Sequence, residues 1–178
     1  MLNDSKEIWI IKGYEIFALQ GHSGLKIERL AKAVGKSKSS FYHHFADLSL
    51  FIDLLLKYHI EQSYIIAVKE QQAQNIEPDL IHVLIEHKTD LLFNRQLRIN
   101  QNILSFSEIL AKSNKIVGDS FVMVWVNDLG LQLSQRQIDG IFTLALENFF
   151  LQINVETLND EWLSAYFKNL KKIAKNFL

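Results

Sequence analysis

The side chains best suited to contact another molecule lie in one short stretch near the N-terminus. The nineteen residues from Lys26 to His44 carry five basic side chains and a single acidic one, Glu28. The basic residues are Lys26, Arg29, Lys32, Lys36 and Lys38. Ammonium groups bind phosphates, and the hydroxyl and imidazole groups that follow can donate to phosphates and base edges. This stretch therefore indicates a nucleic-acid interface.

Helical spacing predicts which of these side chains point outward. At ~100° per residue, Ser39 and His43 lie opposite Phe41 and Phe45 on a helix. With the two rings packed inward, Ser39 and His43 would reach deepest into a major groove, while flanking donors would reach phosphates. Because serine and histidine are small side chains for contacting base edges, part of the sequence specificity is expected to come from DNA shape. The candidate DNA contacts are Lys26, Lys36, Ser37, Lys38, Ser39, Ser40, Tyr42, His43 and His44.

The sequence offers little for catalysis or metal binding. It contains no nucleophile elbow, no phosphate-cradling glycine-rich loop and no His-Glu metal motif. His43 and His44 are ~100° apart on a helix, and His82 and His87 are ~140° apart, so neither pair shares a face as an i, i+4 pair does. We expect no enzyme activity, no metal and no cofactor.

Composition favours one helical, cytoplasmic protein. The 178 residues are 48% hydrophobic and 22% charged, which favours a packed core over disorder. One proline and seven glycines leave too few turn residues for an all-β fold. The absence of cysteine fits a reducing compartment, and we see neither a signal peptide nor a membrane span. Since the net charge is −1, DNA contact must come from the local basic stretch.

The elements that must position these side chains are short helices. Apolar periodicity predicts a helix over residues 8–20, a turn at 22–24, and a second helix from Ile27 that ends at Gly35. Ser37 is placed to cap a third helix over 38–45, and Asp47 to cap a fourth over 48–72. Two short helices that meet at a glycine form a helix-turn-helix pattern, whose second helix lies in the major groove. The fourth helix is apolar on nearly every side at first, which predicts burial on more than one side.

Further helices are predicted over residues 79–93, 98–113 and 115–127, followed by a turn at 127–130. Ser134 and Gln137 fit a capping box that opens a helix to about Ile153, and a last helix is predicted over 160–177. The fold class is therefore all-α, with about nine helices. We divide the chain into a helix-turn-helix domain, residues 1–46, and a helical domain for ligand binding and dimerisation, residues 47–178.

Residues 10–51 resemble the DNA-binding domain of the tetracycline-repressor-like (TetR) family of bacterial transcriptional regulators. The resemblance rests on the segments IIKGYEIFALQG and KIERLAKAVGKSKSSFYHHF, with Gly21, Ala31, Gly35, Ser37, Tyr42 and Phe45 at the family's spacing. Two positions depart from the pattern. Lys26 stands where the family usually has a capping threonine, and Leu48 stands where it usually has a lysine that binds phosphate.

The resemblance implies a homodimer that binds a palindromic operator, usually as a repressor, and that a small-molecule ligand releases. Polar and aromatic side chains of the later helices are candidates for a ligand pocket: His87, Asn100, Ser105, Phe106, Glu108, Phe121, Trp125, Asn148 and Phe149. The last two helices are candidates for the dimer interface, through Ile138, Gly140, Ile141, Phe142, Ala145, Phe149, Leu163, Phe167 and Leu170.

Each of these interpretations has an alternative. The pocket candidates could be ordinary core and surface residues, and the apolar stripes of the last two helices could be satisfied within one subunit. The lysines of the last helix suit a helix C-terminus and indicate no second DNA contact. A helical adaptor that binds only protein is the alternative function, although it would not need an outward-facing cationic recognition helix.

Overall fold

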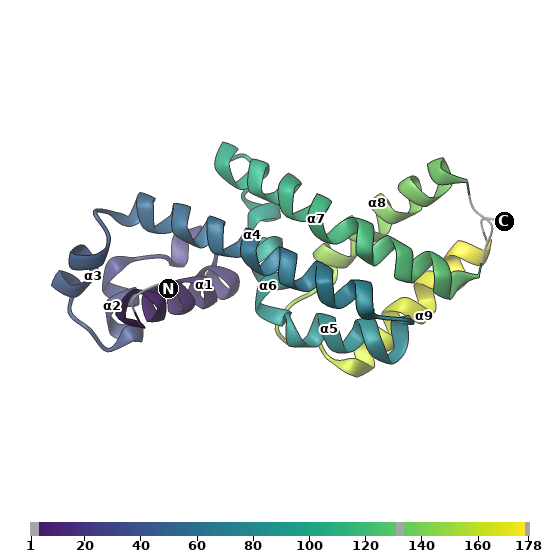
Figure 1. The fold of residues 1–178 in the computed structure, drawn as a ribbon, viewed down its shortest axis with the longest axis horizontal. Helices are drawn as coiled ribbons and strands as arrows, with labels where there is room; N and C mark the ends of the chain where they lie inside the picture. The colour runs from purple at the N-terminus through teal and green to yellow at the C-terminus, as the bar shows by residue number, and fades with distance from the viewer. Residues whose placement is uncertain (1–3, 131–133, 177–178) are drawn as a thin grey trace. The chain divides into compact units, whose positions relative to one another are not determined.

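The chain is all-α in the computed structural model, which describes residues 4–130 and 134–176 (Figure 1). No strand occurs in these ranges, so the predicted fold class is confirmed. Nine α-helices cover most of them: α1 (Asp4–Gln20), α2 (Ile27–Val34), α3 (Lys38–His44), α4 (Leu48–Gln72), α5 (Ile81–Glu86), α6 (Lys88–Ile99), α7 (Leu104–Leu129), α8 (Gln135–Gln152) and α9 (Asp160–Asn176). Two short turns of other helix types, His22–Gly24 and Ile76–Leu80, precede α2 and α5.

The residues fall into two compact units. Unit 1 consists of residues 1–62 and 89–113, and unit 2 of residues 63–88 and 114–178. Both α4 and α7 therefore have residues in each unit. The predicted boundary between residues 46 and 47 separates two expected functions and does not describe compact units. This division into domains stays a prediction.

Local signals end α2 and cap α3 and α4 as predicted. Gly35 ends α2 in the left-handed conformation, with φ 70° and ψ 31°, a conformation that glycine adopts without a steric penalty. Ser37 Oγ then accepts from the backbone N–H of Ser40 at 3.2 Å and caps α3. Asp47 caps α4 in the same way, because its carboxylate accepts from the N–H of Leu50 at 2.9 Å.

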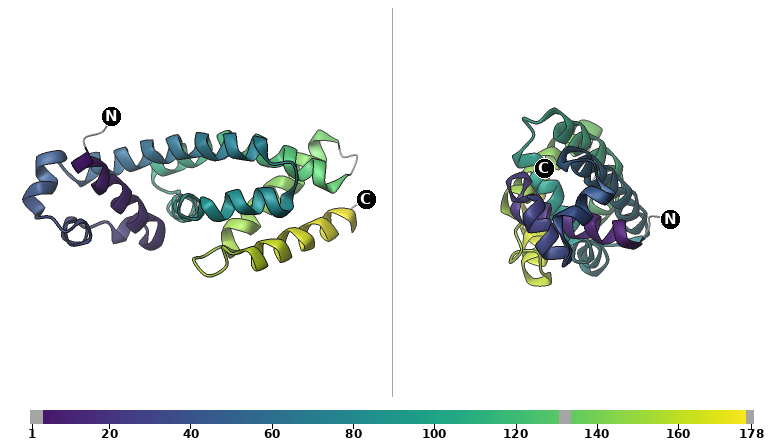
Figure 2. Two further views of the ribbon diagram at one scale, coloured as in Figure 1. Left: turned by 60° about the horizontal axis from the view of Figure 1, so that its bottom comes forward. Right: turned by 90° about the vertical axis from the view of Figure 1, so that its left-hand side faces the viewer.

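An aromatic cluster holds the first helices of unit 1 against α4. The ring of Phe41 on α3 lies 5.5 Å from Trp9 of α1 and 5.4 Å from Phe51 of α4, and all three side chains are fully buried. Gly13 permits this approach, because a Cβ there would collide with the Phe51 ring. The first three helices, α1 to α3, consequently lie around the beginning of α4 (Figures 1 and 2). Leu50, by contrast, is half exposed, so the start of α4 is not covered on every side in this chain.

The predicted helices between residues 79 and 127 have the wrong ends. The helix expected over 79–93 is broken at His87 into α5 and α6, and α6 continues to Ile99. Its end is marked by Asn100, whose side chain donates to the carbonyl of Gln96 at 2.8 Å. The helix expected from residue 98 does not start until Leu104.

The break expected near residue 114 is absent, because α7 is continuous. Polar residues at this point are accommodated inside the helix. Ser113 Oγ donates to the carbonyl of Leu110 at 3.3 Å, and it accepts from Asn94 of α6 at 2.9 Å. The helix runs to Leu129, into the turn predicted at 127–130, and Gly130 follows with φ 61°.

In unit 2, α8 and α9 pack on each other, and α5 packs on α9. Tyr166 of α9 donates to the carbonyl of Ala145 on α8 at 2.9 Å, and its ring lies 5.5 Å from Phe149. The predicted capping box is present at the start of α8, where Gln137 accepts from the N–H of Ser134 at 3.0 Å. The last helix ends at Asn176, and predicted residue 177 lies outside the described residues. None of the described helices is both long and apolar enough to span a membrane.

Candidate nucleic-acid interface

The outer face of α3 is arranged as its helical spacing predicts. Phe41 and Phe45 are 0% and 4% exposed, so one side of α3 is fixed to the core. Ser39 and His43, on the opposite side, are both exposed. Tyr42 beside them is 56% exposed although it is aromatic. The helix therefore presents hydroxyl, imidazole and phenol groups from a rigid base.

The flanking hydrogen-bond donors differ in their exposure and in the contacts that they already make. Lys26 and Lys36 are exposed at the two ends of α2, one before it and one after it. Ser40 is half-buried, and the Ser37 oxygen is occupied by the cap on α3. Lys26 occupies the position before α2 without a side-chain hydrogen bond to the helix, so its ammonium group makes no cap. Leu48, the second departure from the family pattern, is half-buried.

Lys38 forms an ion pair with Glu28, which was not among the candidate contact residues predicted from the sequence. Its Nζ lies 2.9 Å from Oε1 of Glu28 on α2, and both side chains are more than half exposed. This hydrogen bond lowers the pKa of Glu28 and raises the pKa of Lys38. A carboxylate thus lies beside α3 and neutralises the charge of Lys38. A lone acidic residue inside a basic stretch was the signal in the sequence.

The start of α1 also reaches α3. Because α1 begins at Asp4, four residues earlier than predicted, Ser5 and Lys6 are helical. Ser5 Oγ lies 3.0 Å from Nε2 of His44, and Lys6 Nζ lies 5.4 Å above the ring of Phe45. His44, which the sequence assigned to a phosphate, is half-buried at this contact. These contacts tie the end of α3 to α1.

The pocket candidates fall in both units. Ser105 and Glu108 line one surface groove in unit 1, together with Asp53, Lys57 and other residues of α4 and α7. Phe106 is buried against Phe17, and Asn100 caps α6. In unit 2, Asn148 lines a groove between α8 and α9, whereas the remaining candidates are buried or half-buried: His87, Phe121, Trp125 and Phe149. That these candidates line a single ligand pocket remains a prediction.

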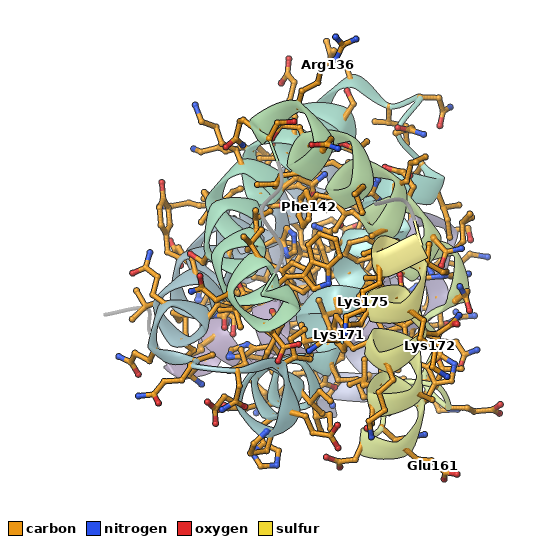
Figure 3. The ribbon with its side chains drawn as sticks, turned by 90° about the vertical axis from the view of Figure 1, so that its right-hand side faces the viewer. Arg136, Phe142, Glu161, Lys171, Lys172 and Lys175 are labelled. Atoms are coloured by element: carbon orange, nitrogen blue, oxygen red, sulfur yellow. The ribbon has the colours of Figure 1, made fainter. Side chains whose placement is uncertain are left out.

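Four of the interface candidates lie inside the protomer. They are Ala145, Phe149, Leu163 and Phe167, all less than 10% exposed. Their apolar area is already satisfied within unit 2, as the alternative interpretation allowed. The other candidates keep accessible surface: Ile138, Gly140, Ile141, Phe142 and Leu170. On α9, Lys171, Lys172 and Lys175 follow one another along the last turns (Figure 3). Lys171 donates to the carboxylate of Asp128 at 2.9 Å.

Comparison with known proteins agrees with this geometry. Residues 12–47, which contain α2 and α3, match the model of the bacterial regulatory proteins of the tetR family. None of the curated proteins matches the sequence.

Two crystal structures share the fold over nearly the whole chain. A transcriptional regulator from Rhodococcus sp. Rha1 aligns with a TM-score of 0.63 and 14% identity, covering 96% of this chain and 95% of that one. A protein from Mesorhizobium loti MAFF303099, assigned to the TetR-family transcriptional regulators, aligns with a TM-score of 0.61 and 16% identity, covering 98% and 95%. Residues 12–47 are therefore similar to the bacterial regulatory proteins of the tetR family, and the chain as a whole shares the fold of these two structures.

Proposed function

We propose that the chain is a homodimeric repressor that binds a palindromic operator through α3 and leaves it when a small-molecule ligand binds. The observation that carries the proposal is the outward face of α3, where Ser39 and His43 are exposed opposite the buried Phe41 and Phe45. In this arrangement Ser39 and His43 read base edges, and Lys26, Lys36, Lys38 and Tyr42 contact phosphates.

A dimer is required by the geometry of the operator. Two half-sites one turn apart demand recognition helices ~34 Å apart, which a pair of chains can hold at a fixed distance. We place the interface on the exposed faces of α8 and α9. Leu144 and Leu151 are seven residues apart on α8, so they share a face, and they are 74% and 76% exposed. Large apolar side chains so exposed on one face favour association.

The dimer is tested by sedimentation velocity on the full chain. Changing both Leu144 and Leu151 to Glu is expected to convert the dimer to a monomer, because charge at a dry interface is costly. Leu19→Glu is the matched control, since Leu19 is 55% exposed on α1 in unit 1. A wild-type protein that sediments as a monomer contradicts the proposal.

DNA binding is tested by fluorescence anisotropy with duplexes from upstream of the protein's own gene and with a scrambled duplex. His43→Ala is expected to reduce the preference for the specific duplex about tenfold, the usual effect of losing one base contact. His82→Ala, at an exposed histidine of α5, is the control and should bind as the wild type does. Absence of binding to either duplex at low salt contradicts the proposal and favours a protein-binding adaptor.

A ligand can release the operator only by binding one arrangement of the dimer more tightly than the other. The element suited to transmit this preference is α4, because it contacts α3 through Phe51 and continues into unit 2. In the anisotropy assay, a ligand of the protein should weaken DNA binding by the ratio of its affinities for the two arrangements.

A further inference from the structure

A carboxyl group of unit 2 is buried, and the described part of the chain gives it no hydrogen-bond partner. Glu70 on α4 is 0% exposed, and neither of its carboxylate oxygens has a partner among the residues that the structure describes. Buried polar groups in folded proteins nearly always have one, because burial removes the water that would otherwise bind them. Hydrogen bonds to the described residues therefore do not account for the burial of the Glu70 carboxyl group.

The neighbours of Glu70 on α4 fix the direction of its side chain. Lys69 pairs with Glu86 of α5 at 2.5 Å, and Gln71 donates to Ser120 of α7 at 3.3 Å. Successive residues of a helix are rotated by ~100°, so Glu70 leaves α4 between these two directions. Its carboxyl group consequently points into the interior of unit 2, between α5 and α7.

Among the described residues of unit 2, no neighbouring charge compensates Glu70. Burial alone raises the pKa of its carboxyl group to about 8, with no contribution from a neighbouring charge. The nearest basic residue in the chain, Lys69, is already paired with Glu86. On the α7 side, the contact next to Glu70 is the neutral pair Gln71 and Ser120. The carboxyl group is thus mostly protonated at neutral pH until a cation reaches it.

The remainder of unit 2 is rich in aromatic side chains. The ring of Phe121 lies 5.7 Å from Phe142 and 6.0 Å from Phe167. Trp125 is 1% exposed, and its indole N–H also has no partner among the described residues. Aromatic faces attract cations and accept apolar groups, which suits the two ends of an amphipathic amine.

We propose that Glu70 anchors a binding site in unit 2 for an organic amine with one positive charge and an apolar body. The ammonium group binds the carboxylate, and the apolar body packs on the aromatic side chains. On binding, the acid loses its proton to solvent, so ammonium and carboxylate form a neutral pair. A carboxylate-bearing ligand is disfavoured, because a second negative charge would face Glu70. The inference rests on the proposed function, in that it names the ligand class.

The experiment measures binding to the full chain, without DNA, by isothermal titration calorimetry at pH 7. The probes are octylammonium, 1-octanol and octanoate, which share a chain and differ in the head group. Octylammonium is expected to bind at least about tenfold more tightly than either other probe, as a charged hydrogen bond would give. Titrations in phosphate and Tris buffers should show release of about one proton per site.

Glu70→Gln should remove both the preference for octylammonium and the proton release. Glu61→Gln is the matched control, because Glu61 is exposed on the same helix. Glu70→Leu is the second variant, and it should fold at least as stably as the wild type because no carboxyl group is left buried. Equal binding of octanol, tighter binding of octanoate, or an unchanged preference in Glu70→Gln would overturn the inference.

A separate DNA-binding assay distinguishes this inference from the proposed function. Octylammonium that binds at Glu70 without changing the affinity for DNA would support the site and contradict ligand release. Release of DNA by octylammonium that persists in Glu70→Gln would support ligand release and contradict this site.

Discussion

The phenol oxygen of Tyr14 lies 2.7 Å from Nδ1 of His59 in the buried interior of unit 1. The same oxygen donates to Oδ1 of Asp90 at 2.8 Å. Because a phenol has a single proton, His59 must donate its Nδ1–H to the Tyr14 oxygen. The three residues come from α1, α4 and α6, so a polar network ties the first helix to two others. Hydrogen bonds have strict geometry, and this network therefore fixes the position of α1 more narrowly than apolar packing would.

Removing the phenol oxygen should destabilise the protein. Tyr14→Phe is expected to lower the free energy of unfolding by about 1–3 kcal/mol, because it leaves buried partners short of a hydrogen bond. Urea denaturation followed by circular dichroism measures the change. The control is Tyr58→Phe, whose half-buried ring lies 5.0 Å from the Tyr14 ring. An equal loss in both variants would show that the network contributes nothing particular.

His59 should make the protein less stable as the pH falls. Burial lowers the pKa of His59 to about 4, against 6.5 in the unfolded chain. Between these values the unfolded state binds a proton that the native state does not, so acidification favours unfolding. The loss is expected from pH 6.5 down to about 4 and amounts to about 3 kcal/mol at most. His59→Gln should flatten the stability profile in this window, as measured by urea titrations. A profile that keeps its slope would contradict the assignment.

Glu70 should change the stability of the protein with pH in the opposite direction from His59. Burial raises the pKa of Glu70 to about 8 in the folded protein, above the ordinary value of 4.5, so the native state holds the extra proton between these values. Stability should therefore fall as the pH rises from about 4.5 to 8, by up to about 5 kcal/mol. In Glu70→Gln, thermal unfolding scans should show this decrease removed. If the variant and the wild type lose stability equally over this range, Glu70 is not buried as described.

The ion pair between Lys38 and Glu28 should set the electrostatic part of DNA binding. Lys38→Ala is expected to weaken binding to many sequences and to reduce the log–log salt slope by about one unit. Glu28→Gln should act in the other direction, because it frees the Lys38 ammonium and removes a negative charge from beside the phosphates. Lys168→Ala is the control, since Lys168 of α9 pairs with Glu77 in unit 2. Fluorescence anisotropy titrations at salt concentrations from about 50 to about 200 mM measure the affinity for DNA and its salt slope. Unchanged affinity and slope in Lys38→Ala would contradict its assignment to phosphate.

Two glycines should respond to alanine with opposite signs. Neither Gly35 nor Gly140 has an atom within 4 Å of the position of an added Cβ, so any effect comes from the backbone. Gly35 has φ 70°, and Gly35→Ala is expected to cost about 1 kcal/mol or more. Gly140 lies within α8, and Gly140→Ala should stabilise the protein by about 0.5–1 kcal/mol. Thermal unfolding of the two variants measures both, and shifts of equal sign would contradict this account.

Much of the N-terminal region could be predicted because its signals act over a few residues. Gly35, Ser37 and Asp47 each end or cap a helix through backbone groups at most four positions away. The outward position of Ser39 and His43 followed from the same short-range periodicity. Helix ends between residues 79 and 127 could not be predicted in this way. There, polar residues that resemble a break are satisfied by partners distant in sequence, such as Ser113 by Asn94.

By itself, the sequence determined that the chain is all-α and which side chains of α3 face outward, since both follow from spacing along one helix. Only the tertiary structure decided which charges are neutralised and which polar groups lose water. Glu28 and Lys38 are ten residues apart and meet because α2 packs on α3. Glu70 is one more glutamate in the sequence, and it becomes chemically distinct because packing leaves its carboxyl group 0% exposed. Burial and pairing depend on how helices come together, and therefore neither can be derived from the order of residues along a single helix.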